Sequence, residues 1–146
     1  YIQSYNPNSH WIIESHPDVY NKIVKDGWLD KPNVNVIFKT WQEVLEDLPK
    51  FDGIYFDTWN EDQFLFDAYA NRILKEGGIY SFFNNPRTSD KKLNPLTQQI
   101  LNENFDIITN PVEIKGPIKN AESYFDKDIK TYWSPECRLK KNEKIY

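Results

Sequence analysis

Several features are scarce in this sequence of 146 residues, and each scarcity excludes a class of protein. No long apolar run is present and the mean hydropathy is -0.74, which argues against a membrane-spanning helix and favours a soluble chain. The single cysteine, Cys137, cannot form an internal disulfide, so we expect the cytoplasm or another reducing intracellular compartment. The net charge of -4 gives no electrostatic reason to expect a nucleic-acid partner.

Methionine is absent altogether, and this bears on the N-terminus. The opening residues read like the end of a helix that runs into a turn at "YNPNS", where Pro7 follows Asn6. We therefore expect an N-terminally incomplete chain that begins inside a longer protein.

The residues that are present suffice for one folded domain. Hydrophobic residues make up 39% of the chain and aromatic residues 16%, so a core can form. The length suits one domain better than two, and we expect residues 1–146 to form a single, partial domain.

Apolar stretches of strand length alternate with stretches of helical periodicity. Strands are predicted at residues 11–14, 34–39, 53–57 and 78–83, and helices at residues 16–28, 40–48, 61–74 and 95–104. This alternation predicts parallel strands joined by crossover helices, which is an α/β fold of the Rossmann-like type. Three more strands are predicted at residues 105–110, 112–116 and 130–139, the last two as an antiparallel pair at one edge.

Two helix boundaries carry a chemical signal. Thr40 followed by Glu43 is the capping-box arrangement, which predicts that a helix begins there. The glycines of "KEGG" (residues 75–78) are predicted to stop the helix of residues 61–74.

Ligands of open α/β sheets bind beyond the carboxyl ends of the strands, and three positions are prominent there. Glu14 ends one predicted strand, and a carboxylate can accept hydrogen bonds from both hydroxyls of a ribose. Trp41 follows the next strand and offers a flat apolar face to an adenine. Asp57 ends the strand of "FDGIYFD" and is a candidate for holding a substrate.

Each of these residues also has a purely structural interpretation. Glu14 could be an exposed strand end, and Trp41 could be packed in the core. Asp57 could cap the helix predicted from residue 61, a role for which Asn60 competes.

The remaining reactive residue types do not indicate a second centre. His10 and His16 lack a ligand-like spacing with Cys137 or with an acidic cluster, so no metal site is expected. Cys137 is expected to be a small buried apolar group and not a nucleophile.

The order of three stretches is more specific than any single residue. "HWIIESHPDV", "TWQEVLEDLPKFDGIYFDTW" and "ILKEGGIYSFFN" together resemble the guanidinoacetate N-methyltransferase family and its relatives, the arginine Nδ-methyltransferases of type IV. The likeness covers residues 10–84 well and is closer to the arginine branch in "HPDV", "TWQEVL" and "GGIYSFFN". "YWSPECRL" also resembles the C-terminal strand of the arginine enzymes.

The resemblance implies a class I methyltransferase sheet with S-adenosylmethionine as the methyl donor. It places Glu14 on the donor's ribose, and it places Ser15 and His16 beside the adenosyl group and Thr40 and Trp41 around the adenine. Asp57 is implied as the catalytic acid that meets both donor and substrate, and Asn84 as a residue that borders the substrate.

The sequence departs from the family pattern at several places. The family's first strand and the glycine-rich loop after it are absent from this chain, so either the protein is longer or a partner protein completes the sheet. Lys39 stands where the family has a glycine near the adenine, and "NNPRTSDKK" replaces the usual substrate loop.

The sequence is therefore consistent with two functions of different classes. The first is an enzyme that methylates a guanidino group, in guanidinoacetate or another small molecule, or in protein arginine, with the arginine branch favoured. The alternative is a catalytically degenerate methyltransferase-fold subunit, a pseudoenzyme with a structural role in a larger assembly. A nicotinamide-dependent oxidoreductase would also use Glu14, but "FDGIYFDT" has no place in that scheme.

Overall fold

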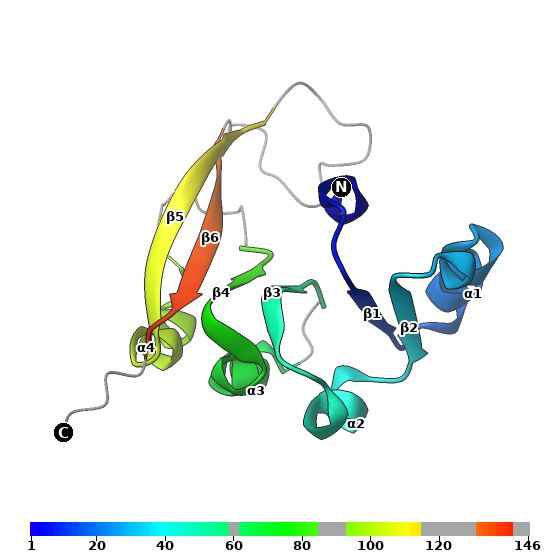
Figure 1. Cartoon of the computed structure of the whole chain (residues 1–146). Helices are drawn as coiled ribbons and strands as arrows, with labels where there is room; N and C mark the ends of the chain where they lie inside the picture. The colour runs from blue at the N-terminus through cyan, green and yellow to red at the C-terminus, as the bar shows by residue number, and fades with distance from the viewer. Residues whose placement is uncertain (59–61, 85–92, 115–130, 142–146) are drawn as a thin grey trace. The chain divides into compact units, whose positions relative to one another are not determined.

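The structure, a computed structural model, describes residues 1–58, 62–84, 93–114 and 131–141 and divides into two compact units (Figure 1). The first unit is Tyr1–Leu48 and the second is Pro49–Tyr146. Predictions about Asn60, about most of the "NNPRTSDKK" segment and about the end of the strand at residues 112–116 lie outside the described residues.

The first unit contains a two-stranded parallel sheet. Its elements are β1 (His10–Glu14), α1 (Pro17–Lys25), β2 (Val34–Phe38) and α2 (Trp41–Val44), with 3-10 turns at Ile2–Tyr5, Trp28–Asp30 and Leu45–Asp47. The two strands pair along their whole length, so that Glu14 lies opposite Phe38 at their carboxyl ends. The segments that follow the two strands therefore leave the sheet at the same edge.

Local side-chain signals fix where the two helices of this unit begin. Nδ1 of His16 accepts a hydrogen bond from the backbone N–H of Asp18 at 3.2 Å, and Pro17 occupies the first helical position, where its missing N–H breaks no hydrogen bond. Oγ1 of Thr40 accepts from the N–H of Glu43 at 3.3 Å, and Oε1 of Glu43 accepts from the N–H of Thr40 at 3.3 Å. The predicted capping box is confirmed.

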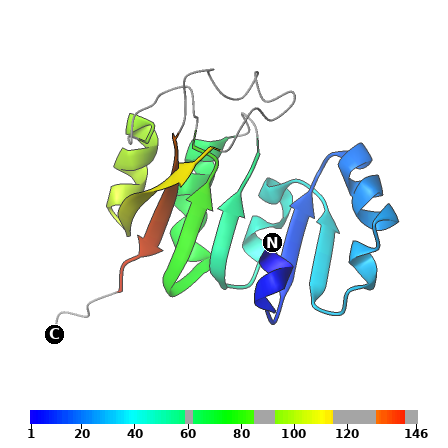
Figure 2. The same cartoon turned by 90° about the horizontal axis from the view of Figure 1, so that it is seen from above.

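The second unit contains a four-stranded sheet with two helices. Its elements are β3 (Phe51–Phe56), α3 (Gln63–Tyr69), β4 (Leu74–Phe82), α4 (Pro95–Asn102), β5 (Phe105–Glu113) and β6 (Thr131–Leu139), with a 3-10 turn at Ala70–Arg72. The strand order is β3-β4-β6-β5; β3 is parallel to β4, and β6 is antiparallel to both of its neighbours. Figure 2 shows β3, β4 and β6 side by side. The expected α/β fold, with an antiparallel pair at the edge of the sheet, is confirmed.

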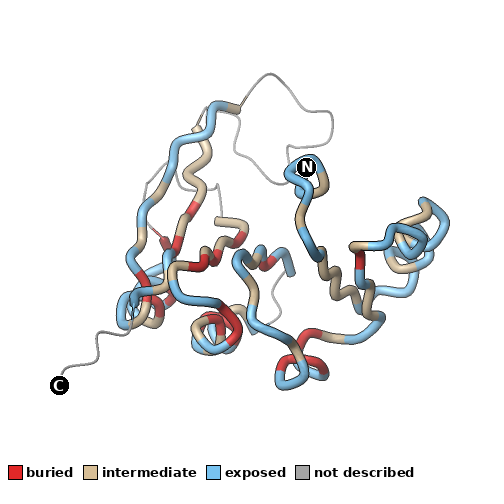
Figure 3. Tube along the Cα trace, in the orientation of Figure 1, coloured by how far each residue is buried: buried red, intermediate tan, exposed pale blue. Residues whose placement is uncertain are grey.

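An aromatic core joins α3 to the sheet. Phe66 of α3 stacks on Phe56 of β3 with ring centroids 4.4 Å apart. The ring centroids of Phe66 and of Tyr80 in β4 are 5.6 Å apart. Tyr80 and Leu101 of α4 are both 0% exposed, and Figure 3 shows buried positions on both helices and on the strands. Burial of each such side chain contributes about 1.5–3 kcal/mol, so this core holds the strands whose carboxyl ends carry the candidate site.

The predicted role of "KEGG" as a glycine stop is wrong. The helix ends at Tyr69 and a 3-10 turn follows, while residues 75–78 already belong to β4. The pairing of β3 with β4 shifts register at this point, and Gly77 there has φ +73°. A Cβ on Gly78 would lie 2.8 Å from the carbonyl oxygen of Lys75. The two glycines therefore allow a β-bulge in the strand and do not end a helix, because only glycine fits at positions 77 and 78.

The strands predicted separately at residues 105–110 and 112–116 form one strand, β5, over their described part. Pro111, which stands between the two predicted strands, lies within β5 opposite Trp133 of β6. Because β5 is at the edge of the sheet, a residue without an N–H can be tolerated there.

Candidate functional site

The carboxyl end of β1 presents a carboxylate that the backbone holds in place. Oε1 of Glu14 accepts a hydrogen bond from the N–H of His16 at 2.9 Å, and Glu14 is half-buried whereas Ser15 and His16 are exposed. A carboxylate has about four acceptor positions on two oxygens, so Glu14 keeps acceptor capacity for a ligand. This arrangement fits the two hydroxyls of a ribose, which need an acceptor-only partner.

The segment after β2 lies at the same edge of the first sheet. The side chain of Thr40 takes part in the capping box, where its hydroxyl also donates a hydrogen bond to Oε1 of Glu43 at 2.9 Å. This hydrogen bond lowers the pKa of the Glu43 carboxyl. Trp41 is only 6% exposed, as the structural interpretation of this residue expected. Its role beside an adenine stays a prediction.

Asp57 and Asn84 follow neighbouring parallel strands of the second unit. Phe56, the last residue of β3, pairs with Phe82, the last residue of β4, and the candidate residues come within two positions of these strand ends. The structure therefore brings Asp57 and Asn84 to one edge of this sheet. Although Asp57 is largely exposed, partial burial raises the pKa of its carboxyl, so this carboxylate accepts a proton more readily than an ordinary aspartate.

Asp57 does not cap α3. The helix begins at Gln63, and its N-cap position is Asp62, whose side chain makes no capping hydrogen bond. Asp57 lies well before this position in the chain and is exposed to solvent. The structural interpretation of Asp57 as the cap of this helix is wrong, so capping does not account for its carboxylate at the sheet edge.

A tyrosine that the sequence analysis missed lies against Asn84. The hydroxyl oxygen of Tyr132 accepts a hydrogen bond from the N–H of Asn84 at 2.8 Å, and its ring stacks on Phe83 with centroids 5.7 Å apart. Nδ2 of Asn84 donates to the carbonyl oxygen of the next residue, Trp133, at 3.1 Å. Because β6 runs antiparallel to β4, the start of β6 lies beside the carboxyl end of β4.

Tyr55 was also missed, although its spacing was a usable signal. It precedes Asp57 by two residues, and side chains two apart in a strand point to the same face. Burial, with the nearby Tyr132 and Asp57, raises the pKa of Tyr55 to about 12. Burial and the charge of Asp57 also raise the pKa of Tyr132, against the effect of its hydrogen bond with Asn84. Both hydroxyls therefore remain protonated near neutral pH.

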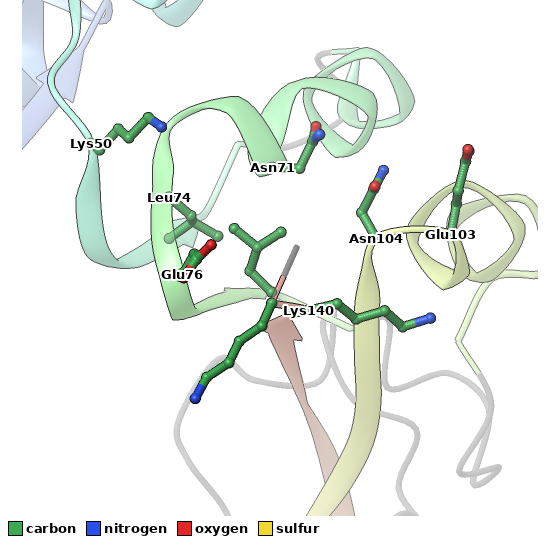
Figure 4. A pocket seen from close by; sticks show the side chains of 9 residues that line it. Lys50, Asn71, Leu74, Glu76, Glu103, Asn104 and Lys140 are labelled. Atoms are coloured by element: carbon green, nitrogen blue, oxygen red, sulfur yellow. The ribbon is translucent and has the colours of Figure 1, made fainter. Parts of the chain in front are cut away.

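A hollow at the other end of the second sheet is a poorer candidate (Figure 4). Leu74, where β4 begins, and Leu139, where β6 ends, mark it as lying away from the carboxyl end of β4. The lining also contains Lys50, Asn71, Glu76, Glu103, Asn104, Lys140 and Lys141. These charges are mixed in sign, and none of the predicted site residues is among them.

The environment of Cys137 is that of a core residue. Cys137 is 0% exposed, and burial raises the pKa of its thiol to about 12, as expected of a small core residue. Among the residues that the structure describes, no three histidine, cysteine or acidic side chains gather as a metal-binding group. Within those same residues, no helix has the length and apolar character to cross a membrane.

Most of the chain matches one known protein family. The guanidinoacetate N-methyltransferase family matches residues 1–108. Protein arginine N-methyltransferase 2 of Yarrowia lipolytica is 44% identical over 91 residues, which cover 58% of this chain and 19% of that protein. The protein of the same name from Debaryomyces hansenii is 34% identical, with 94% of this chain and 38% of that protein covered. The chain thus spans only a minor part of these curated relatives.

Solved structures agree on the fold. Precorrin-6y C5,15-methyltransferase from Geobacter metallireducens superposes with a TM-score of 0.61 at 16% identity, over 90% of this chain and 67% of that one. Fibrillarin from Aeropyrum pernix, solved with bound S-adenosyl-L-methionine, gives a TM-score of 0.58 at 14% identity, over 90% and 55% of the two chains. These similarities show the class I methyltransferase fold, and the alternative of a degenerate subunit gains no support from them. Because the family match extends over residues 1–108, the chain belongs to the guanidinoacetate N-methyltransferase family.

Proposed function

We propose that the protein to which this chain belongs is an S-adenosylmethionine-dependent N-methyltransferase that acts on a guanidino group, with protein arginine as the favoured acceptor. Membership of the family supports the reaction type, and the relatives named protein arginine N-methyltransferase 2 support the acceptor. The observation that carries the proposal is Asp57, a carboxylate directly after β3 at the edge that it shares with Asn84.

Glu14 serves the donor in this proposal. When bound, S-adenosylmethionine supplies a methyl group on a positively charged sulfur. The carboxylate of Glu14 accepts hydrogen bonds from the ribose hydroxyls, and the N–H of His16 fixes its orientation at 2.9 Å. A carboxylate that is already oriented loses less conformational freedom on binding, which favours affinity.

Asp57 serves the acceptor. Its two carboxylate oxygens can take two N–H groups of a guanidino group in parallel, which orients the attacking nitrogen. Its negative charge also stabilises the positive charge that grows on this nitrogen during transfer. The raised pKa of Asp57 suits one of its oxygens to receive the proton that leaves the nitrogen.

A transfer assay with matched acceptors tests the proposal. The purified protein is incubated with methyl-labelled S-adenosylmethionine and an arginine-containing peptide, guanidinoacetate, or the same peptide with lysine in place of arginine. We expect label on the arginine peptide, less on guanidinoacetate and none on the lysine peptide. Binding of the donor without label on any guanidino acceptor would contradict the proposal.

A further inference from the structure

We infer that Tyr132 is a positioning residue for the acceptor: its hydroxyl fixes Asn84, so that the amide oxygen of Asn84 can accept a hydrogen bond from the guanidino group. The inference rests on the proposed function, since it concerns the substrate side of the same site. It assigns a role to β6, a strand 48 residues away from Asn84 in the sequence.

Three contacts tie the end of β4 to the start of β6. The hydroxyl oxygen of Tyr132 accepts from the backbone N–H of Asn84 at 2.8 Å, and the ring of Tyr132 stacks on Phe83 at an interplanar angle of 17°. The carbonyl oxygen of Trp133 accepts from Nδ2 of Asn84 at 3.1 Å. Backbone and side chain of Asn84 are thus both held by consecutive residues of one strand.

The pattern of donors and acceptors says what Asn84 can bind. A side-chain amide has two donor hydrogens on nitrogen and an acceptor oxygen. Because Nδ2 of Asn84 is directed to Trp133, its Oδ1 is the atom that remains for an acceptor role at this edge. A guanidino group carries only N–H donors at neutral pH, so Asn84 and Asp57 both match it as acceptors.

Electrostatics keeps Tyr132 in the form that this role requires. Burial and the charge of Asp57 raise the pKa of Tyr132, so its hydroxyl stays neutral and adds no second negative charge beside Asp57. Burial, followed by the effects of Tyr132 and Asp57, raises the pKa of Tyr55 to about 12. A substrate therefore meets one formal negative charge, on Asp57, among these three side chains.

Fixing Asn84 before binding lowers the ordering that substrate must impose, so its loss should appear in substrate affinity. In the purified protein, Tyr132→Phe keeps the ring on Phe83 and removes only the hydroxyl. We expect the KM for the arginine peptide to rise roughly threefold to tenfold, which corresponds to one hydrogen bond. We expect kcat and the Kd for S-adenosylmethionine to change by less than about twofold.

Tyr69→Phe is the matched control, since it removes a tyrosine hydroxyl from α3 of the same unit. It should leave the KM unchanged. The double variant Tyr132→Phe, Asn84→Ala adds a second test, because Asn84→Ala removes the amide that Tyr132 positions. In that background Tyr132→Phe should raise the KM little further; a full additional increase, or an unchanged KM in Tyr132→Phe alone, would overturn the inference.

Hydrogen exchange separates this inference from the proposed function. The N–H of Asn84 should exchange at least several-fold faster in Tyr132→Phe than in the unaltered protein or in Tyr69→Phe, with no substrate present. Unchanged exchange contradicts the positioning role whatever the acceptor is. Faster exchange in a protein that methylates no guanidino acceptor would instead contradict the proposed function, and with it the guanidino group as the ligand of Asn84, while the contact between Tyr132 and Asn84 would stand.

Discussion

The hydroxyl of Tyr80 donates a hydrogen bond of 2.7 Å to Oδ1 of Asp67 inside the second unit, where the two residues are 0% and 2% exposed. The bond joins β4 to α3. Burial raises the pKa of Asp67 to about 6, although the hydrogen bond from Tyr80 and the nearby Thr97 act in the opposite direction. A carboxyl group in this position is therefore linked to stability through pH.

Asp67→Asn should remove part of the pH dependence of unfolding. Between about pH 4 and pH 6 the unfolded chain releases the proton of Asp67 while the folded chain retains it, so this group's contribution to stability is lost as pH rises. The loss is about 2–3 kcal/mol for a pKa difference of this size. Urea unfolding at pH 4 and pH 7 measures it, with Asp106→Asn as the exposed control. An Asp67→Asn variant with the pH dependence of the unaltered protein would contradict this account.

Gly78→Ala should destabilise the second unit, because the new Cβ would lie 2.8 Å from the carbonyl oxygen of Lys75 and 3.2 Å from that of Asp52. Both atoms belong to backbone, which yields less easily than a side chain, and we expect a cost of about 1–3 kcal/mol. Gly53→Ala in the adjacent strand is the control, since its Cβ would meet only the carbonyl oxygen of Ile79 at 3.9 Å. Thermal or urea unfolding measures the stability of both variants. Equal stability of Gly78→Ala and Gly53→Ala would refute the packing argument.

Glu14→Gln should weaken donor binding. The substitution replaces one acceptor oxygen by an NH₂ group and removes the charge, so one of the two ribose hydroxyls loses its partner. We expect the Kd for S-adenosylmethionine to rise about tenfold or more, measured by calorimetry. Glu46→Gln, at an exposed position of the first unit, is the control. An unchanged Kd in the Glu14→Gln variant would remove Glu14 from the donor site.

Transfer should depend on pH through Asp57. Because its pKa is raised above 3.8, kcat/KM should begin to fall at a higher pH than an ordinary aspartate would cause, as the carboxylate becomes protonated. Circular dichroism at each pH separates this loss from unfolding. A kcat/KM that stays constant down to about pH 4 in folded protein would show that the charge of Asp57 is not required.

Much of the fold could be predicted because the signals are local. The apolar alternation of β1 to β4 and the capping box of Thr40 each lie within a few residues. The bulge at Gly77 could not be predicted, since the same glycines also fit a helix end and only the pairing with β3 distinguishes the two. The continuity of β5 through Pro111 depends likewise on its place at the sheet edge.

The candidate site could likewise be predicted only where the signal is local in the sequence. Glu14 and Asp57 could be named as candidates because each ends or follows an apolar strand, whereas Asn84 is indicated only by the family resemblance; the roles of all three stay predictions. Tyr132 could not, because its contact with Asn84 depends on the antiparallel pairing of β6 with β4, which no local pattern specifies.

The measurement that tests the central claim most directly is methyl transfer to an arginine peptide by the unaltered protein and by Asp57→Asn, with the fold of both followed by circular dichroism. We predict transfer by the first protein and a loss of roughly 100-fold or more in the second, because the amide cannot balance the growing charge or accept the proton. Near-normal turnover in a folded Asp57→Asn protein would contradict the account.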